Sequence, residues 1–152
     1  MSAVDAAVQT IHLLVGAFWV GSVVFVTVGV LPVARDGDAN AAPVERMVRR
    51  LTTISRASAV LMLITGGHLA GVGYTVENLT GTTRGHLVIG MVVLWLALAG
   101  LVEVGAARLT DGLQKKKVRA PARDSDRLFW LASITGALLL VDAGLLSAGI
   151  LT

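Results

Sequence analysis

The 152-residue sequence contains no cysteine. This absence excludes disulfide bonds, thiolate metal sites, iron–sulfur clusters and covalent c-type haem attachment. Any metal site must therefore use histidine, methionine, carboxylate or backbone ligands. The sequence also lacks a nucleophile–base–acid set, a phosphate-binding loop and a pair of carboxylates that would indicate a hydrolase or a transferase. Catalysis would accordingly depend on a bound cofactor.

Charged residues are scarce: they make up 15% of the chain, against 55% hydrophobic residues. This composition is unlike that of a soluble globular domain and indicates that the chain resides in lipid. Four apolar runs are each long enough to cross about 30 Å of hydrocarbon as a helix of roughly 20 residues. The runs are Ile11–Leu31, Ala57–Val76, Leu87–Val102 and Leu128–Leu151, the last interrupted only by Asp142.

We therefore predict an all-α fold, an integral membrane four-helix bundle that forms a single transmembrane domain over residues 1–152. The expected helices cover about residues 9–31, 54–72, 86–107 and 127–150. Residues 1–10 contain no lysine or arginine, whereas a cleavable signal peptide needs a basic region ahead of its apolar segment. We expect the first apolar run to stay in the protein as a helix.

Basic residues are distributed unevenly, with twelve of the thirteen lysines and arginines in two segments, 32–56 and 106–127. The positive-inside rule makes these two segments cytoplasmic loops, so that both termini and residues 71–85 face outward. The location is a cell membrane crossed several times. Lipid headgroups, rather than nucleic acid, are the expected partner of the net charge of +3.

This topology brings all three histidines, His12, His68 and His86, to the outer side of the membrane. Neighbouring helices pack about 8–10 Å apart, so imidazoles at one depth can meet on a single metal ion or haem iron. The simpler alternative is that each ring bonds a carbonyl, a headgroup or water at the interface. Both interpretations remain open at this stage.

Four other residues have side chains whose chemistry stands out within the apolar runs. Asp142 costs about 2.5–3.5 kcal/mol to insert at a helix centre, so it should face the bundle interior as a metal ligand, an acceptor that orients an imidazole, a proton carrier or a structural acid. Glu103 is expected to form an interfacial ion pair with Arg56 or Arg108, which lie at similar depth. Met62 and Met91 could donate thioether sulfur to Cu(I), although methionines in membrane helices usually fill gaps.

The two halves of the sequence are similar to one another. HLLVG begins at His12 and HLVIG at His86, while ITGGHL begins at Ile64 and ITGALL at Ile134. Corresponding helices would cross the membrane in the same direction, which indicates a parallel duplication of a helical hairpin.

Several motifs resemble the copper resistance D domain family of polytopic membrane proteins. They are HLLVGAFWVGSVVFVTVGVLP, RRLTTISRASAV, LITGG and TRGHL, and the resemblance extends from about residue 10 to residue 150. It implies copper handling, usually uptake from the outer side, with His12, His68 and His86 as the metal-binding histidines. One departure is that many members have a lysine early in the third helix, where this chain has Gly90, Met91 and Val92.

Three functions are compatible with these features. The first is copper binding and uptake through His12, His68 and His86, with Asp142 below them. The second is b-type haem bound by two of these histidines, because the chain is also similar in plan to the small HemJ-type membrane haem proteins. The third is an accessory subunit, in which the glycine-rich helices pack against a membrane-complex partner or a second copy of the chain.

Overall fold

Residues 2–148, the part of the chain that this computed structural model describes, form helices joined by short connections and contain no strand. The all-α prediction is confirmed over this range. The last two residues of the predicted helix 127–150 lie outside it. The elements in chain order are α1 (Ala3–Phe25), the π-helical segment η1 (Val26–Val30), α2 (Leu31–Asp36), α3 (Ala41–Gly73), α4 (Val76–Gly81), α5 (Thr83–Gln114) and α6 (Arg119–Ala148).

The first three elements form one continuous helical rod. It begins at a capping box, in which the Ser2 hydroxyl accepts the Asp5 N–H and the Asp5 carboxylate accepts the Ser2 N–H. Near its other end, Pro32 has no N–H to give to the preceding turn. The Leu31 N–H bonds the Val26 carbonyl, five residues back, and the wider π turn absorbs the missing bond without ending the rod.

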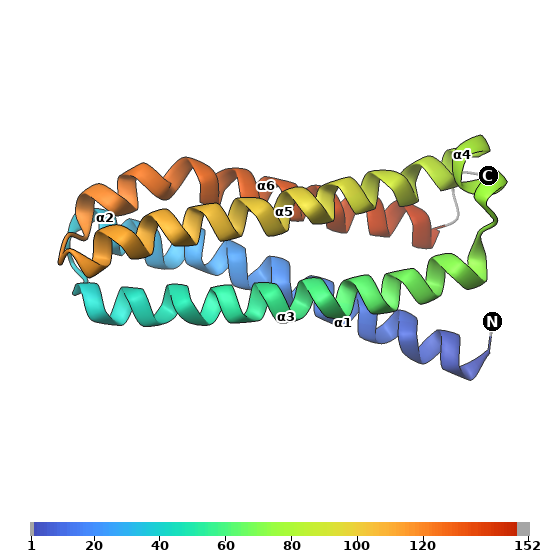
Figure 1. The fold of residues 1–152 in the computed structure, drawn as a ribbon, viewed down its shortest axis with the longest axis horizontal. Helices are drawn as coiled ribbons and strands as arrows, with labels where there is room; N and C mark the ends of the chain where they lie inside the picture. The colour runs from blue at the N-terminus through green and yellow to red at the C-terminus, as the bar shows by residue number, and fades with distance from the viewer. Residues whose placement is uncertain (1, 149–152) are drawn as a thin grey trace.

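Four long helical segments run side by side along the molecule (Figure 1). The start of α1, the short helix α4 and the end of α6 lie at one end, called here the α4 end. The connections from α2 to α3 and from α5 to α6 lie at the opposite end, called the α2 end. In the interior, the Trp19 side chain of α1 is fully buried and donates its indole N–H to the Ser55 hydroxyl of α3 at 2.9 Å.

Among the described residues, three helical stretches are long and apolar enough to cross a membrane: Ala3–Asp36, Thr83–Gln114 and Arg119–Ala148. The helix α3 is not among them, although its second half coincides with one of the four apolar runs. The reason is compositional. The first half of α3 carries four arginines, and its second half contains His68 and three glycines before Gly73.

Large apolar side chains cover the outside of the molecule as well as its interior. Leu14, Phe18 and Phe25 on α1 and Val93 on α5 are each more than half exposed. Exposed apolar residues this numerous are unusual on a protein surface in water and are expected on helices surrounded by lipid.

The two basic segments predicted as loops are mostly helical. Only residues 37–40 separate α2 from α3, and only residues 115–118 separate α5 from α6. Gly37 makes the first of these tight connections possible by adopting a positive φ of 85°.

The prediction of loops was wrong because it followed charge and did not consider amphipathic spacing. Val44, Val48 and Leu51 recur on one face of α3 and are buried, while Arg49 pairs with Glu45 on the exposed face at 2.7 Å. The helices therefore continue well beyond the apolar stretches.

Candidate functional site

His12 lies in α1, half-buried, and its ring is held by the neighbouring helix α3. The Nδ1 atom is 2.7 Å from the Thr65 hydroxyl oxygen, and that hydroxyl donates its own proton to the Leu61 carbonyl, also at 2.7 Å. With the hydroxyl proton assigned to the Leu61 carbonyl, Thr65 accepts a hydrogen bond from Nδ1–H. The Nε2 atom then keeps its lone pair, which is the form of imidazole that binds a metal ion.

Gly66 allows α3 to come this close to the imidazole. A Cβ atom on Gly66 would lie 3.0 Å from the Cε1 atom of His12, which is tighter than ordinary van der Waals contact. A side chain at this position would displace the His12 ring by a few tenths of an ångström, so Gly66 favours the His12–Thr65 contact. Thr65 and Gly66 together hold the ring of His12 against α3.

Two cavities, of about 170 Å³ and 220 Å³, lie beside His12. Both are bordered by His12 of α1, Gly66 and Ala70 of α3, and Val88 and Met91 of α5. The smaller one, called here the inner cavity, also has Met62, Trp95 and Leu139 on its wall. The larger one extends toward the α4 end and is further lined by Gln9, Tyr74, Arg84 and Ser147.

Asp142 on α6 is 8% exposed, and its Oδ1 atom has no hydrogen-bond partner among the described residues. Its Oδ2 atom lies against Gly90, where a Cβ would be 3.7 Å away. Gly90 immediately precedes Met91, so Asp142 is close to the height of the two cavities. It faces the interior as its sequence predicts, but it is not among the residues that line either cavity.

His68 is engaged elsewhere, with the first turn of α1. Its Nε2 atom lies 3.3 Å from Oδ1 of Asp5, and the pair is partly exposed. Asp5 also accepts the Ser2 N–H within the capping box. His68 thus joins the beginning of α1 to the last turns of α3.

His86 is exposed at the start of α5, where its Nε2 atom bonds the Thr80 carbonyl of α4 at 3.0 Å. The structure therefore gives His12, His68 and His86 three different partners. Within residues 2–148, no group of three histidine, aspartate or glutamate side chains is arranged to hold a metal ion together. Of the three histidines, only His12 lines either of the cavities described above.

The same placement bears on the haem alternative. Bis-histidine ligation requires two imidazoles on opposite faces of one porphyrin. His68 and His86 bond Asp5 and Thr80, and neither lines a cavity with His12. The described residues do not fit that ligand pair.

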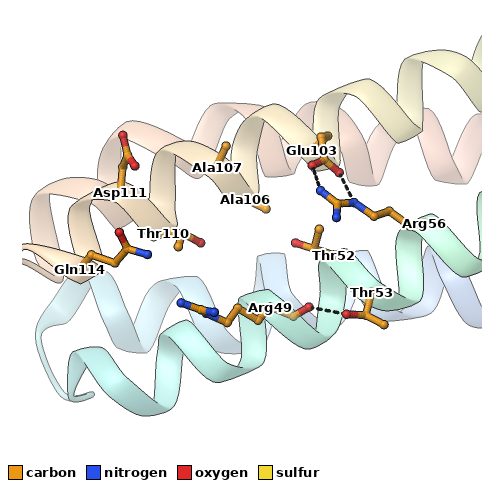
Figure 2. A pocket seen from close by; sticks show the side chains of 10 residues that line it. All are labelled: Arg49, Thr52, Thr53, Arg56, Glu103, Ala106, Ala107, Thr110, Asp111 and Gln114. Carbon is orange, nitrogen blue, oxygen red and sulfur yellow. Dashed lines mark hydrogen bonds and ion pairs between the residues drawn. The ribbon is translucent and has the colours of Figure 1, made fainter.

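A second hollow, a cleft of about 540 Å³, lies between α3 and α5 toward the α2 end. Figure 2 shows its lining, with Arg49 and Arg56 from α3 and Glu103 and Asp111 from α5. Two arginines and two carboxylates leave the cleft without an excess of either charge. It therefore offers no clear preference for an anionic or a cationic ligand.

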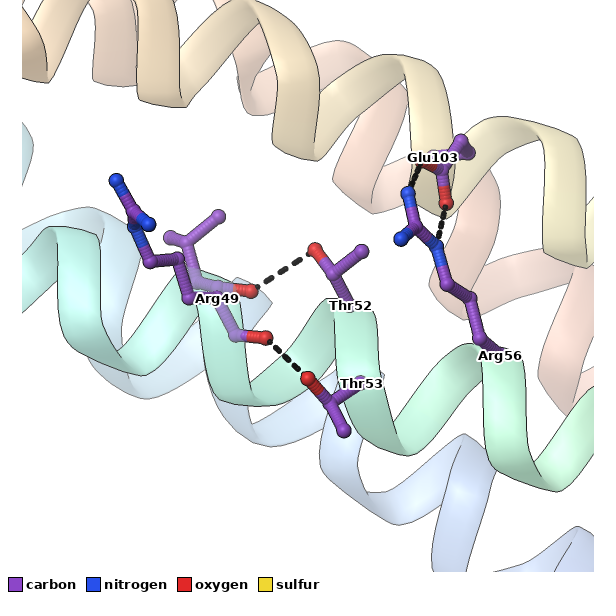
Figure 3. A network of polar contacts seen from close by, with 6 residues as sticks. Arg49, Thr52, Thr53, Arg56 and Glu103 are labelled. Atoms are coloured by element: carbon purple, nitrogen blue, oxygen red, sulfur yellow. Dashed lines mark hydrogen bonds and ion pairs between the residues drawn. The ribbon is translucent and has the colours of Figure 1, made fainter.

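Figure 3 shows the polar contacts around this cleft. Arg56 forms an ion pair with Glu103 across the two helices, with its Nε atom 3.2 Å from Oε2. The ion pair expected for Glu103 is present, and Arg56 is its partner. The Thr52 and Thr53 hydroxyls donate to carbonyls one turn earlier in α3. The Arg56–Glu103 pair therefore links α3 to α5, whereas the two threonine bonds lie within α3.

The role of Thr65 was not predicted from the sequence. It lies in the ITGGHL motif, where His68 has the more conspicuous metal-binding side chain. The usable signal was the hydroxyl of Thr65, since a polar side chain on a buried helix face must bond something. Its partner in another helix could not be read from the sequence.

The comparisons with known proteins give one match. A sequence model of the family described as copper resistance protein D (CopD) matches residues 45–146, which is more than half of the chain. The matched region includes Thr65, both cavity methionines and Asp142, whereas His12 precedes it. No curated protein and no solved structure matches the chain.

Proposed function

The chain belongs to the copper resistance protein D family, and from this premise we propose that it binds copper through His12 and moves the ion inward across the membrane. Three apolar helices and the family make it a multi-pass membrane protein. The observation that carries the proposal is the His12 imidazole, held by Thr65 through Nδ1 on the wall of two cavities.

Copper suits the available donors. Imidazole nitrogen is a good copper ligand, and the chain has no cysteine that would form a thiolate site for zinc or an iron–sulfur cluster. The Thr65 contact fixes the ring orientation, which is the usual role of a hydrogen bond to the nitrogen that does not bind the metal. We assign copper contact to His12, and assign His68 and His86 to the helix contacts described above.

The proposal includes α3 as a fourth membrane span. Val60, Leu63, Ile64 and Val72 of this helix are each more than half exposed, as expected for a face in lipid. With four spans, the basic segments at the α2 end are cytoplasmic by the positive-inside rule, and the α4 end faces outward. His12 and its cavities then lie on the side from which copper arrives.

The test is the copper content of the purified full-length chain, loaded with copper in detergent and dialysed. We expect bound copper in the wild type and in His86→Ala, because His86 is exposed and its ring bonds the Thr80 carbonyl. We expect its loss in His12→Ala. Cells that express the wild type should also accumulate more copper than cells that express His12→Ala. Equal copper content in the wild type and His12→Ala, or none in the wild type, would contradict the proposal.

A further inference from the structure

We propose that the inner cavity binds copper as Cu(I), with the thioether sulfurs of Met62 and Met91 as ligands beside His12. The inference rests on the proposed copper function and adds the oxidation state and two ligands. Its basis is that one cavity wall brings together an imidazole and two thioethers from three different helices, α1, α3 and α5.

Met62 is fixed close to the turn of α1 that carries His12. It is 6% exposed, and a Cβ on Gly16 would lie 3.6 Å from its sulfur. Gly16 follows His12 by one helical turn, so the two residues share a face of α1. On α3, Met62 precedes Thr65 by three residues. The Met62 side chain and the Thr65 hydroxyl that contacts His12 therefore lie on one face of α3 as well.

Met91 approaches from α5 and lines both cavities. It is half-buried and packs against the hydrophobic core. Because its side chain is unbranched and flexible, its sulfur can adjust to an ion held between α1 and α3. The three donor residues therefore border one space.

The chemistry of the wall favours the monovalent ion. Thioether sulfur is a soft ligand that selects Cu(I), while Cu(II) prefers nitrogen and oxygen donors in a tetragonal arrangement. The wall of the inner cavity contains no aspartate, glutamate, lysine or arginine. Moving an ion from water into apolar surroundings costs free energy, and the cost is larger for a doubly charged ion than for a singly charged one. Neutral ligands do not offset this charge, so they favour Cu(I) over Cu(II).

The experiment measures binding of Cu(I), and of Ag(I) as an air-stable soft monovalent probe, to the full chain in detergent. Met62→Leu and Met91→Leu nearly preserve side-chain volume but remove the sulfur. Each should weaken Cu(I) and Ag(I) binding at least about tenfold, the loss seen when even a group that merely supports a metal ligand is removed. Met47→Leu is the matched control, because Met47 lies at the α2 end, away from both cavities.

X-ray absorption of the bound copper supplies a second readout, which does not depend on affinity. Sulfur scattering at Cu–S distance should be present in the wild type and in Met47→Leu, and reduced in each cavity variant. Unchanged Cu(I) affinity in the double variant Met62→Leu/Met91→Leu, or a copper shell of nitrogen and oxygen alone, would overturn this inference while leaving copper binding at His12 in place. A wild type that binds copper in neither oxidation state would overturn the proposed function itself.

Discussion

At the scale of single residues, the orientation of His12 depends on one hydroxyl group. Thr65 accepts the Nδ1–H and donates to Leu61, so removing the hydroxyl would leave Nδ1 without its partner. We predict that Thr65→Val lowers copper affinity by about 10- to 100-fold, the range typical of losing such a supporting hydrogen bond. Competition titration against a copper chelator measures this loss.

Valine has nearly the shape of threonine, so a change in packing is minimised, and Thr65→Ser provides the matched control. Serine retains the hydroxyl and should keep most of the affinity. If Thr65→Val and the wild type bind copper equally well, the Thr65 contact does not orient the ligand. If serine is as weak as valine, the methyl group of Thr65 matters more than its hydroxyl.

The chemistry of individual residues was predictable from the sequence, and so was the pairing of Glu103 with Arg56, but the partners of the histidines were not. His12 stood out because an imidazole in an apolar run must bond something, and Asp142 had to face inward because of its charge. His68 bonds Asp5, a residue 63 positions away, and this pairing depends on how α1 is rotated against α3. The spacing of residues within one helix does not determine how that helix is rotated against its neighbour. The expected meeting of the three histidines therefore remains a prediction, and the contacts of the described residues do not support it.

At the scale of elements, the close packing of α5 against α6 depends on Gly112. A Cβ at this position would overlap the ring of Pro121, whereas a Cβ on Gly100 of the same helix would meet nothing within 4 Å. We predict that Gly112→Ala destabilises the fold by roughly 1–3 kcal/mol, as overpacking usually does. Gly100→Ala should be neutral or stabilising by up to about 1 kcal/mol, because alanine favours the helix.

Thermal unfolding in detergent, followed by circular dichroism, compares the two alanine variants. The midpoint should fall for Gly112→Ala and should stay level or rise for Gly100→Ala. Similar midpoints for both variants would show that the start of α6 can shift away from Gly112 without loss. The hairpin between α5 and α6 would then be looser than its contacts indicate.

Helices were predictable where their residues are apolar and were missed where they are amphipathic. A run of apolar residues identifies a span by length alone, and this succeeded for α1, α5 and α6. Beyond the apolar runs, a helix is indicated by apolar residues that recur every three or four positions. Val44, Val48 and Leu51 have this spacing within a basic stretch and are buried. The density of arginines, read as a loop signal, concealed that spacing.

At the scale of the whole molecule, the His12 cavities and the polar cleft are separated by fully buried side chains. The His12 cavities lie toward the α4 end and the polar cleft toward the α2 end, while Trp19, Leu98 and Phe129 between them are fully buried. An ion that moved through the interior from the inner cavity toward the α2 end would meet these buried side chains. The proposed movement of copper across the membrane therefore requires the packing between these helices to change.

The orientation of the molecule can be measured because the native chain contains no cysteine. Single cysteines can be placed at Asp38, Glu77 and Lys117, which are exposed in or near the connections between helices. With a membrane-impermeant maleimide on intact cells, we predict labelling of Glu77→Cys alone. Asp38→Cys and Lys117→Cys should react only after permeabilisation, because the positive-inside rule places the α2 end in the cytoplasm. The cysteine-free wild type is the background control.

The same three positions also count the spans, since Asp38 and Glu77 flank α3 while Glu77 and Lys117 flank α5. If α3 crosses the bilayer, Asp38 and Glu77 must react from opposite sides; labelling of both from one side would reduce the chain to the three spans that composition alone supports. If Asp38→Cys and Lys117→Cys react in intact cells and Glu77→Cys does not, the molecule is inverted. His12 would then open toward the cytoplasm, and the cavity beside it would serve copper release or export instead of capture from outside.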